Sequence, residues 1–184
     1  MIQRGRVWKF GDDISTDLML PGAVLREPIA EQARHVFSVN RPGWVDQVRP
    51  GDVLVGGRNF GMGSARPAPR SLKNLQLGFL LAEQVNSLFF RNCVNFGFLA
   101  LDCPGVGALF DEGDTAELDF AAWQVRNPRT GRTLAPLPLP DRFLAIVRAG
   151  GIFPMLEAEG LIGPPPLAGG RGVIPIQKSE TESS

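Results

Sequence analysis

The sequence predicts an α/β fold in a single compact domain over residues 1–162, followed by a tail at residues 163–184. Between residues 52 and 101, apolar runs suited to buried strands alternate with segments whose apolar residues recur at helical spacing. A chain of 184 residues is long enough to bury one good core. From residue 163 onward the composition turns to proline and glycine and then to polar residues. We therefore expect one folded domain with a partly disordered tail.

The first third of the chain is expected to form a strand, a polar loop and a helix. Residues 4–10 alternate basic and apolar side chains, which is typical of a strand. Residues 12–17 are polar and predict a loop, and the apolar spacing over residues 29–37 predicts a helix. Turn-rich segments then lead into a buried strand at residues 53–55.

The elements that follow are expected to continue the alternation of helix and strand. Gly78 is placed where a glycine commonly ends a helix, and Asn86 or Ser87 can cap the next one, which Gly97 would close. Asp141 can cap a helix after a stiff, proline-rich connector. The expected helices cover residues 68–77, 88–96 and 141–149, the expected strands cover residues 79–82, 98–101, 117–120 and 123–126, and a last short element covers residues 153–161.

Composition excludes several classes of function. Nineteen basic residues balance nineteen acidic ones, so no basic surface proposes nucleic acid or an anionic membrane as a partner. No apolar run approaches the length of a membrane span, and residues 1–6 lack the apolar core of a signal peptide, so we expect a cytoplasmic protein. Cys93, Cys103 and the single histidine, His35, are too few for an iron–sulfur cluster or a zinc site. We interpret both cysteines as small buried apolar residues.

Residues 56–70 form the stretch most suited to bind a ligand. Four glycines, at positions 56, 57, 61 and 63, allow tight turns and a close approach of the backbone to another group. Ser64 and Arg66 follow, and then Pro67, a residue that favours the first position of a helix. A hydroxyl and a guanidinium near a helix start favour binding of a carboxylate. The alternative is a glycine-rich turn from strand to helix with a solvated arginine.

Four motifs, in order, resemble those of one family. Residues 59–66, Asn-Phe-Gly-Met-Gly-Ser-Ala-Arg, resemble the Asn-Phe-Gly-x-Gly-Ser-Ser-Arg signature of the swivelling domain of the aconitase superfamily. Residues 11–17 resemble its opening Gly-Asp-x-Ile-x-Thr-Asp, residues 89–97 its Phe-Phe-Arg-Asn-Ala-Ile-Asn-x-Gly, and residues 149–152 its Ala-Gly-Gly-Leu. Within the superfamily the chain is most similar to the small subunits of 3-isopropylmalate dehydratases. The resemblance implies an aconitase-type swivelling β/β/α domain.

The resemblance also implies an activity and its residues. The reaction removes water from a 2-hydroxy acid and adds it back at the neighbouring carbon. Ser64 would be the base, and Asp17 would orient a partner histidine or a neighbouring substrate group. From the residues alone, Asp17 can instead be a turn or cap residue, and Arg26 a solvated arginine near a helix start. The implied substrate-binding residues are Arg66, Ala65, Gly63, Arg26, Thr16 and Asn59.

The resemblance further implies a partner and a cofactor outside this chain. A 4Fe-4S cluster, bound by three cysteines of a separate large subunit, would bind the substrate hydroxyl, and this chain would bind no cofactor itself. The sequence departs from the family at three positions. Ala65 replaces a second serine, and Pro67 and Ala68 replace a glutamate and a histidine. These departures leave open an alternative function, a non-catalytic swivel-like module for binding or regulation.

Overall fold

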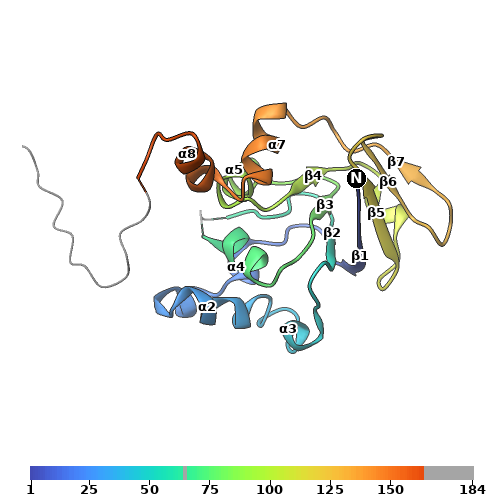
Figure 1. Ribbon diagram of the computed structural model, residues 1–184. Helices are drawn as coiled ribbons and strands as arrows, with labels where there is room; N and C mark the ends of the chain where they lie inside the picture. Colours follow the sequence, from blue (N-terminus) through green and yellow to red (C-terminus); the bar gives the residue numbers. More distant parts are fainter. Residues whose placement is uncertain (64–65, 164–184) are drawn as a thin grey trace, which may run out of the picture.

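The computed structural model describes residues 1–63 and 66–163, and its central feature is one curled sheet of seven strands (Figure 1). The strand order is β4-β3-β2-β1-β5-β6-β7. Strands β1 to β4 are parallel, and β5, β6 and β7 continue the sheet in antiparallel fashion from β1. The strands are β1 (Ile2–Lys9), β2 (Val53–Gly56), β3 (Leu80–Ala82), β4 (Ala100–Asp102), β5 (Thr115–Asp119), β6 (Gln124–Arg126) and β7 (Thr133–Leu134).

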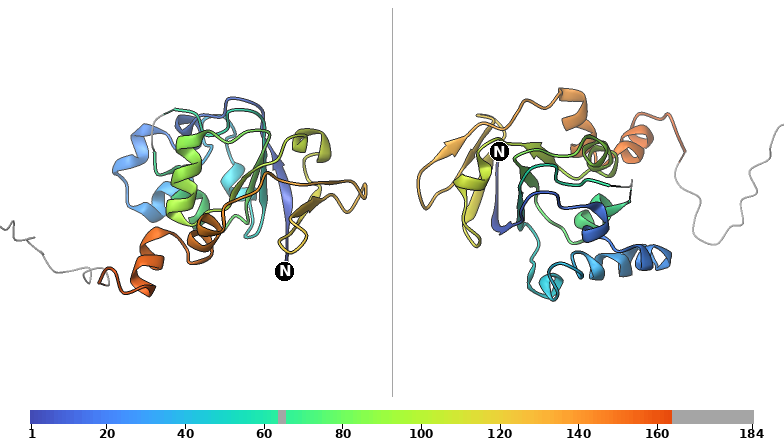
Figure 2. Two further views of the ribbon diagram at one scale, coloured as in Figure 1. Left: turned by 90° about the horizontal axis from the view of Figure 1, so that it is seen from above. Right: turned by 180° about the vertical axis from the view of Figure 1, so that it is seen from behind.

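Helices fill the connections between the parallel strands. Figure 1 shows the antiparallel strands on one side of the molecule and α2, α4 and α5 on the other, with the parallel strands between them, and the reverse view in Figure 2 agrees. In the described residues no helix is both long and apolar enough to traverse a bilayer. The helices are α1 (Thr16–Met19), the 3₁₀ helix η1 (Gly22–Arg26), α2 (Ile29–Gln32), the 3₁₀ helix η2 (Ala33–His35), α3 (Trp44–Gln47), α4 (Ala68–Asn74), α5 (Ser87–Phe96), α6 (Val106–Leu109), α7 (Asp141–Arg148) and α8 (Ile152–Ala158).

The central parallel strands β2 and β3 are buried on both faces, so each carries a nearly continuous apolar run. Because side chains alternate along a strand, Leu54 and Leu80 pack on the face covered by α4 and α5, whereas Val53 and Leu81 pack on the opposite face. The curl of the sheet brings β5 and β6 over that second face, where Ala116, Leu118 and Val125 join its core. The α/β fold expected from the sequence is therefore confirmed.

Several boundaries differ from those expected. The helix after the glycine-rich loop ends at Asn74, and the left-handed residue beyond it is Gln76, with φ of 57°, rather than Gly78. Gly78 has another reason to be glycine, because a Cβ there would lie 2.9 Å from the carbonyl oxygen of Gly51. Asp141 is the first residue of α7, not its cap, since the preceding cap residue is Pro140. The helix expected over residues 29–37 is divided into α2 and η2.

The closing motif of the family resemblance has a packing role. Gly97 ends α5 with φ of 70°, as expected, and Asn86 caps the start of that helix by accepting a bond of 3.1 Å from the N–H of Leu88. A Cβ on Gly97 would overlap the backbone of Gly150, and a Cβ on Gly151 would overlap the carbonyl oxygen of Asn95. The glycines of the turn between α7 and α8 therefore allow it to lie against the end of α5.

An ion-pair cluster fixes the turn before β5 and predicts how stability depends on pH. Arg129 Nε lies 2.6 Å from Asp114 Oδ1, and Asn127 Nδ2 donates to Asp114 Oδ2 at 2.9 Å. The Asp114 side chain is only 8% exposed. The hydrogen bond from Arg129 is the main cause that holds the pKa of Asp114 well below its usual value.

A carboxylate whose pKa is depressed on folding contributes stability above its unfolded-state pKa, which is about 4, and loses it as the pH falls toward the folded-state pKa. We therefore expect Arg129→Met to lower the free energy of unfolding at pH 7, with the difference from the parent chain shrinking below about pH 4. Urea unfolding followed by circular dichroism between pH 2 and 7 measures this. Arg34→Met, which removes a 74% exposed arginine, is the control. A difference that stays constant with pH contradicts the prediction.

Candidate functional site

The two loops that carry the first two motifs meet at one edge of the sheet. The loop after β1 and the loop after β2 both leave the carboxyl ends of neighbouring parallel strands. They are joined by backbone hydrogen bonds: the Asp13 N–H donates to Arg58 at 2.9 Å, the Gly61 N–H to Ile14 at 2.7 Å and the Thr16 N–H to Met62 at 2.8 Å. In α/β sheets, ligands bind outside the carboxyl ends of strands, so this edge is where a site is expected.

The glycines of the second loop allow close packing. Gly61 has φ of 87°, and a Cβ there would overlap the ring of Phe89, which is buried beneath the loop. Gly63 has φ of 105° and a Cβ would lie 3.4 Å from the hydroxyl of Thr16. A side chain at either position would therefore separate the loop from its support or strain its backbone.

Asn59 connects the loop after β2 to the neighbouring elements through the hydrogen bonds of its side chain. It adopts a left-handed conformation, with φ of 53°, which asparagine tolerates better than most residues. Its Nδ2 lies 2.9 Å from Asp13 Oδ1 and 3.4 Å from the sulfur of Met62. Its Oδ1 accepts a bond of 3.2 Å from Asn86, the cap of α5. The structure therefore gives Asn59 a supporting role in the loop, in addition to any contact with substrate.

Asp17 and Arg66, expected in the site from separate motifs, form an ion pair. Ser15 caps α1 by accepting a bond of 3.1 Å from the Leu18 N–H, which places Asp17 in the first turn of that helix. Asp17 Oδ1 contacts Arg66 Nε, and Arg66 Nη1 donates to the carbonyl oxygen of Leu20 at 3.2 Å. The arginine side chain is 20% exposed and the aspartate 61%. A carboxylate and a guanidinium thus stand together at the surface of this edge.

The other expected residues differ in how close they lie to this pair. Thr16 is buried beside Gly63. Gly22, at the start of η1, lies so close to the Arg66 guanidinium that a Cβ would be 2.8 Å from Nη1. Arg26, the exposed last residue of the same 3₁₀ helix, lies four residues after Gly22. At a rise of 2 Å per residue it is about 8 Å from Gly22 along the helix axis. Ser64 and Ala65 lie outside the described residues, between Gly63 and Arg66.

The two residues that depart from the family motif after Arg66 lie at the start of α4. Pro67 precedes α4 as its cap residue, and Ala68 begins the helix with 1% of its surface exposed. Ala68 packs in the core with Leu72, Phe60 and other residues of the face that supports the loop. Position 68 therefore faces the core in this chain, where a small apolar side chain suits the packing.

The cysteines do not fit an iron–sulfur cluster. Cys93 and Cys103 are both fully buried, on opposite faces of the sheet, so they cannot ligate one cluster together. Burial raises the pKa of the Cys103 thiol to about 12, with a further contribution from Glu83, and burial also raises the pKa of Cys93. Thiols with raised pKa values are poor thiolate ligands. The expectation that both are buried apolar residues is confirmed.

Sequence reasoning did not single out three contributors to the site. Asp13 holds Asn59, Asp12 Oδ1 accepts a bond of 2.7 Å from the Arg58 N–H, and Asn86 holds Asn59 from the other side. A signal was available, because strands were expected over residues 4–10, 53–55 and 79–82, and polar residues directly after neighbouring parallel strands gather at one edge. The strand order needed to use it comes only from the structure.

Comparison with known proteins gives several relatives. No family model matches the chain. It is 40% identical over 159 residues to 3-isopropylmalate dehydratase small subunit 1 of Methanopyrus kandleri, covering 85% of this chain and 94% of the relative. It is 37% identical over 160 residues to the isopropylmalate/citramalate isomerase small subunit of Methanocaldococcus jannaschii, covering 86% and 95%. It is 41% identical over 153 residues to the methanogen homoaconitase small subunit of Methanothermobacter thermautotrophicus, covering 82% and 88%.

A solved structure is also similar. The crystal structure of 3-isopropylmalate dehydratase from Methanocaldococcus jannaschii superposes with a TM-score of 0.82 at 30% sequence identity, covering 88% of this chain and 96% of that one. The relatives thus share a type of subunit and a fold, while their names state different substrates.

Proposed function

The chain belongs to the family of 3-isopropylmalate dehydratase small subunits, and on that premise we propose that it completes a two-chain hydro-lyase. With a separate large subunit it interconverts 2-isopropylmalate and 3-isopropylmalate or a related 2-hydroxy di- or tricarboxylic acid. The observation that carries the proposal is the pairing of Asp17 with Arg66 where two motif-bearing loops meet. The alternative, a non-catalytic module, has no support from the relatives, all three of which are named as enzyme subunits.

Removal of water from a 2-hydroxy acid requires a base at the carbon next to the hydroxyl-bearing one. The proton there is weakly acidic because a neighbouring carboxylate is a poor electron sink. Ser64, as an alkoxide, accepts this proton at Oγ, the electrons of the C–H bond form the double bond, and the C–O bond breaks to release hydroxide. The proton taken by Ser64 then passes to that hydroxide, which gives the water that is released and regenerates the alkoxide. An alkoxide persists only where positive charge and N–H donors stabilise it in a closed site. Arg66, two residues along the chain, supplies positive charge close to this loop.

Arg66 and its neighbours also suit the recognition of substrate carboxylates. A guanidinium binds a carboxylate through two parallel N–H donors, and Asp17 and Leu20 fix the orientation of this one. Arg26, exposed at the end of η1, would bind a second substrate group beyond Gly22. Gly63, Thr16 and Asn59 shape the loop, and Ala65 lacks the hydroxyl that the family signature supplies to the substrate.

The leaving hydroxyl calls for a Lewis acid, which a 4Fe-4S cluster on the large subunit supplies. The buried cysteines of this chain do not fit such a cluster. The exposed Asp17 and the neighbouring loop would then face the partner and close the site, excluding water from the substrate.

Reconstitution tests the proposed function. We expect the purified chain alone to have no dehydratase activity and no stoichiometric iron, and the complex with its iron–sulfur large subunit to convert 2-isopropylmalate, citramalate or homocitrate. The appearance of the unsaturated intermediate in ultraviolet absorbance and an iron assay measure this. Iron bound stoichiometrically to the isolated chain, or a loaded complex inactive on all three acids, contradicts the proposal.

Replacing Arg66 by lysine tests whether substrate binding needs the two parallel N–H donors of a guanidinium or only its positive charge. Lysine keeps the charge but cannot contact Asp17 and Leu20 in a fixed planar geometry. We expect kcat/KM of the complex to fall by about 10- to 100-fold, or about 1.4–2.7 kcal/mol. Arg91→Lys, on the exposed side of α5, is the matched control and should be neutral. Near-normal kinetics of Arg66→Lys would mean that Arg66 binds no substrate.

A further inference from the structure

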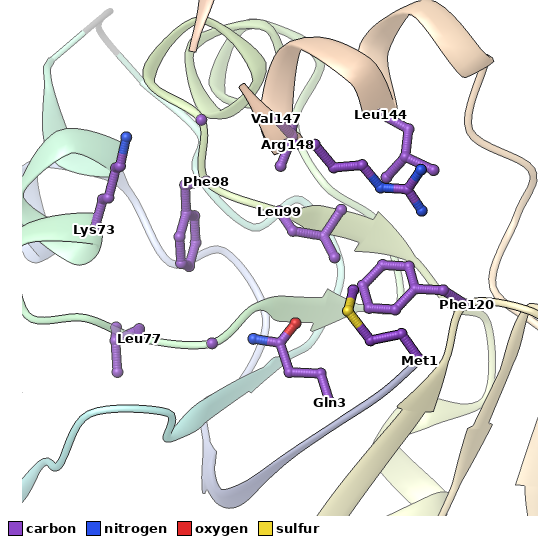
Figure 3. Close-up of a pocket in the computed structure, with 12 residues that line it drawn as sticks. Met1, Gln3, Lys73, Leu77, Phe98, Leu99, Phe120, Leu144, Val147 and Arg148 are labelled. Carbon is purple, nitrogen blue, oxygen red and sulfur yellow. The ribbon is translucent and has the colours of Figure 1, made fainter. Parts of the chain in front are cut away.

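A cavity lies at the opposite edge of the sheet from the candidate site. It is bounded by Gln3 near the start of β1, by Gly78 just before β3 and by Leu99 just before β4 (Figure 3). The candidate site follows the carboxyl ends of the parallel strands, whereas this cavity lies at their amino ends. A ligand bound here would therefore not overlap a substrate at the loops after β1 and β2.

The cavity is apolar and of a size for a small molecule. Its volume is about 180 Å³, and its walls are formed mainly by Leu77, Phe98, Leu99, Phe120, Leu144 and Val147. A cavity of about 150 Å³ lined by aliphatic and aromatic side chains is large enough to bind benzene. This cavity can therefore hold an apolar body of about six carbon atoms with a polar group at its mouth.

The polar side chains around the cavity carry hydrogen-bond donors. Gln3, Lys73 and Arg148 line it, and among the described residues no aspartate or glutamate does so. The Gln3 side chain extends into the cavity between Met1 and Leu77 in Figure 3. Lys73 is fixed by a bond of 2.6 Å from Nζ to the carbonyl oxygen of Gly150, and the Arg148 guanidinium lies 5.8 Å from the centre of the Phe120 ring. Two cations beside an apolar wall, with no carboxylate among the described residues that line it, complement an anion with an apolar body.

We propose that this cavity binds a small monocarboxylate with an apolar body of about five to seven carbon atoms. The body lies against Phe98, Leu99 and Leu144, and the carboxylate accepts hydrogen bonds from the Arg148 guanidinium and the Gln3 amide. The proposal is independent of the proposed function, because it does not involve the residues of the candidate site.

The test compares an acid with its neutral isostere on the full chain. Binding of 4-methylpentanoate and of 4-methylpentanamide is measured by titration of the ¹H–¹⁵N NMR spectrum, up to about 20 mM ligand. We expect saturable binding of the acid, with shifts at residues 3, 78, 98, 99 and 144–148, and binding of the amide that is about tenfold weaker. Equal affinities for the two probes, or no saturation by the acid, would overturn the proposal.

Two variants and a control locate the binding. Arg148→Met keeps an unbranched side chain but removes the charge, and should weaken binding of the acid about tenfold while leaving the amide unchanged. Leu144→Trp fills the cavity and should weaken both probes. Arg142→Met removes an arginine of the same helix that lies 3.4 Å from Glu159 and does not line the cavity, so it should change neither. Unchanged binding of the acid in Arg148→Met and Leu144→Trp places the ligand elsewhere and also overturns the proposal.

Discussion

Replacing Ser64 by alanine is expected to lower the turnover of the two-chain enzyme by about three orders of magnitude or more. The reason is chemical, because alanine has no oxygen to accept the proton. Serine in a glycine-rich loop contributes little packing, so the chain should still fold and bind its partner. The measurement is kcat of the complex at matched iron content, together with the thermal unfolding midpoint of the small subunit.

Comparison with a variant of the next residue, Ala65, distinguishes a catalytic base at position 64 from a residue that only binds substrate, and a serine elsewhere in the chain is the control. Ala65→Ser restores a hydroxyl that, in the family signature, holds the substrate. It should therefore change the free energy of substrate binding, seen as KM or as substrate preference, by about 1 kcal/mol, the net value of one hydrogen bond. Ser87→Ala, at the exposed start of α5, should change nothing. If Ser64→Ala retains most of the turnover, the assignment of the base is wrong.

Gly61→Ala is expected to cause a large loss of stability from a single methyl group. The residue has φ of 87°, and the added Cβ would overlap the ring of Phe89, which is only 1% exposed. The strained backbone and the overpacked core each cost about 1–3 kcal/mol, so we expect the free energy of unfolding to fall by about 2–6 kcal/mol. Urea unfolding of the small subunit measures the change.

Gly131→Ala is the matched control for backbone strain alone. Gly131 has φ of 72°, but nothing lies within 4 Å of a Cβ built on it. We expect this change to cost about 1 kcal/mol. A loss for Gly61→Ala no greater than that for Gly131→Ala would mean that Phe89 moves aside at little cost, and that Gly61 is not required for the loop to pack on α5.

Local signals in the sequence predicted much of this structure. The strands at residues 53–55 and 79–82, and the helix from the Asn86 cap to Gly97, follow from short-range hydrophobic patterns and capping residues. The limits of the other helices were less well predicted. Gly78 is a glycine because a neighbouring turn approaches it, and Gln76 takes the left-handed conformation instead. Long-range contacts thus decided positions where local propensity indicated a different boundary.

The candidate site shows the same division. By itself, the sequence determined the motifs and the α/β class, because turn chemistry and strand patterns depend on neighbours in the chain. The resemblance of those motifs to a known family indicated Asp17, Asn59 and Arg66 as candidate site residues. Only the tertiary structure decided that Asp17 and Arg66 form a pair, that Asn86 and Asp13 hold Asn59, and that a second cavity lies at the amino ends of the strands. The two residues of each of these pairs are 27 to 49 residues apart in the sequence. Their contact therefore depends on the parallel order of β1, β2 and β3, which no local pattern encodes.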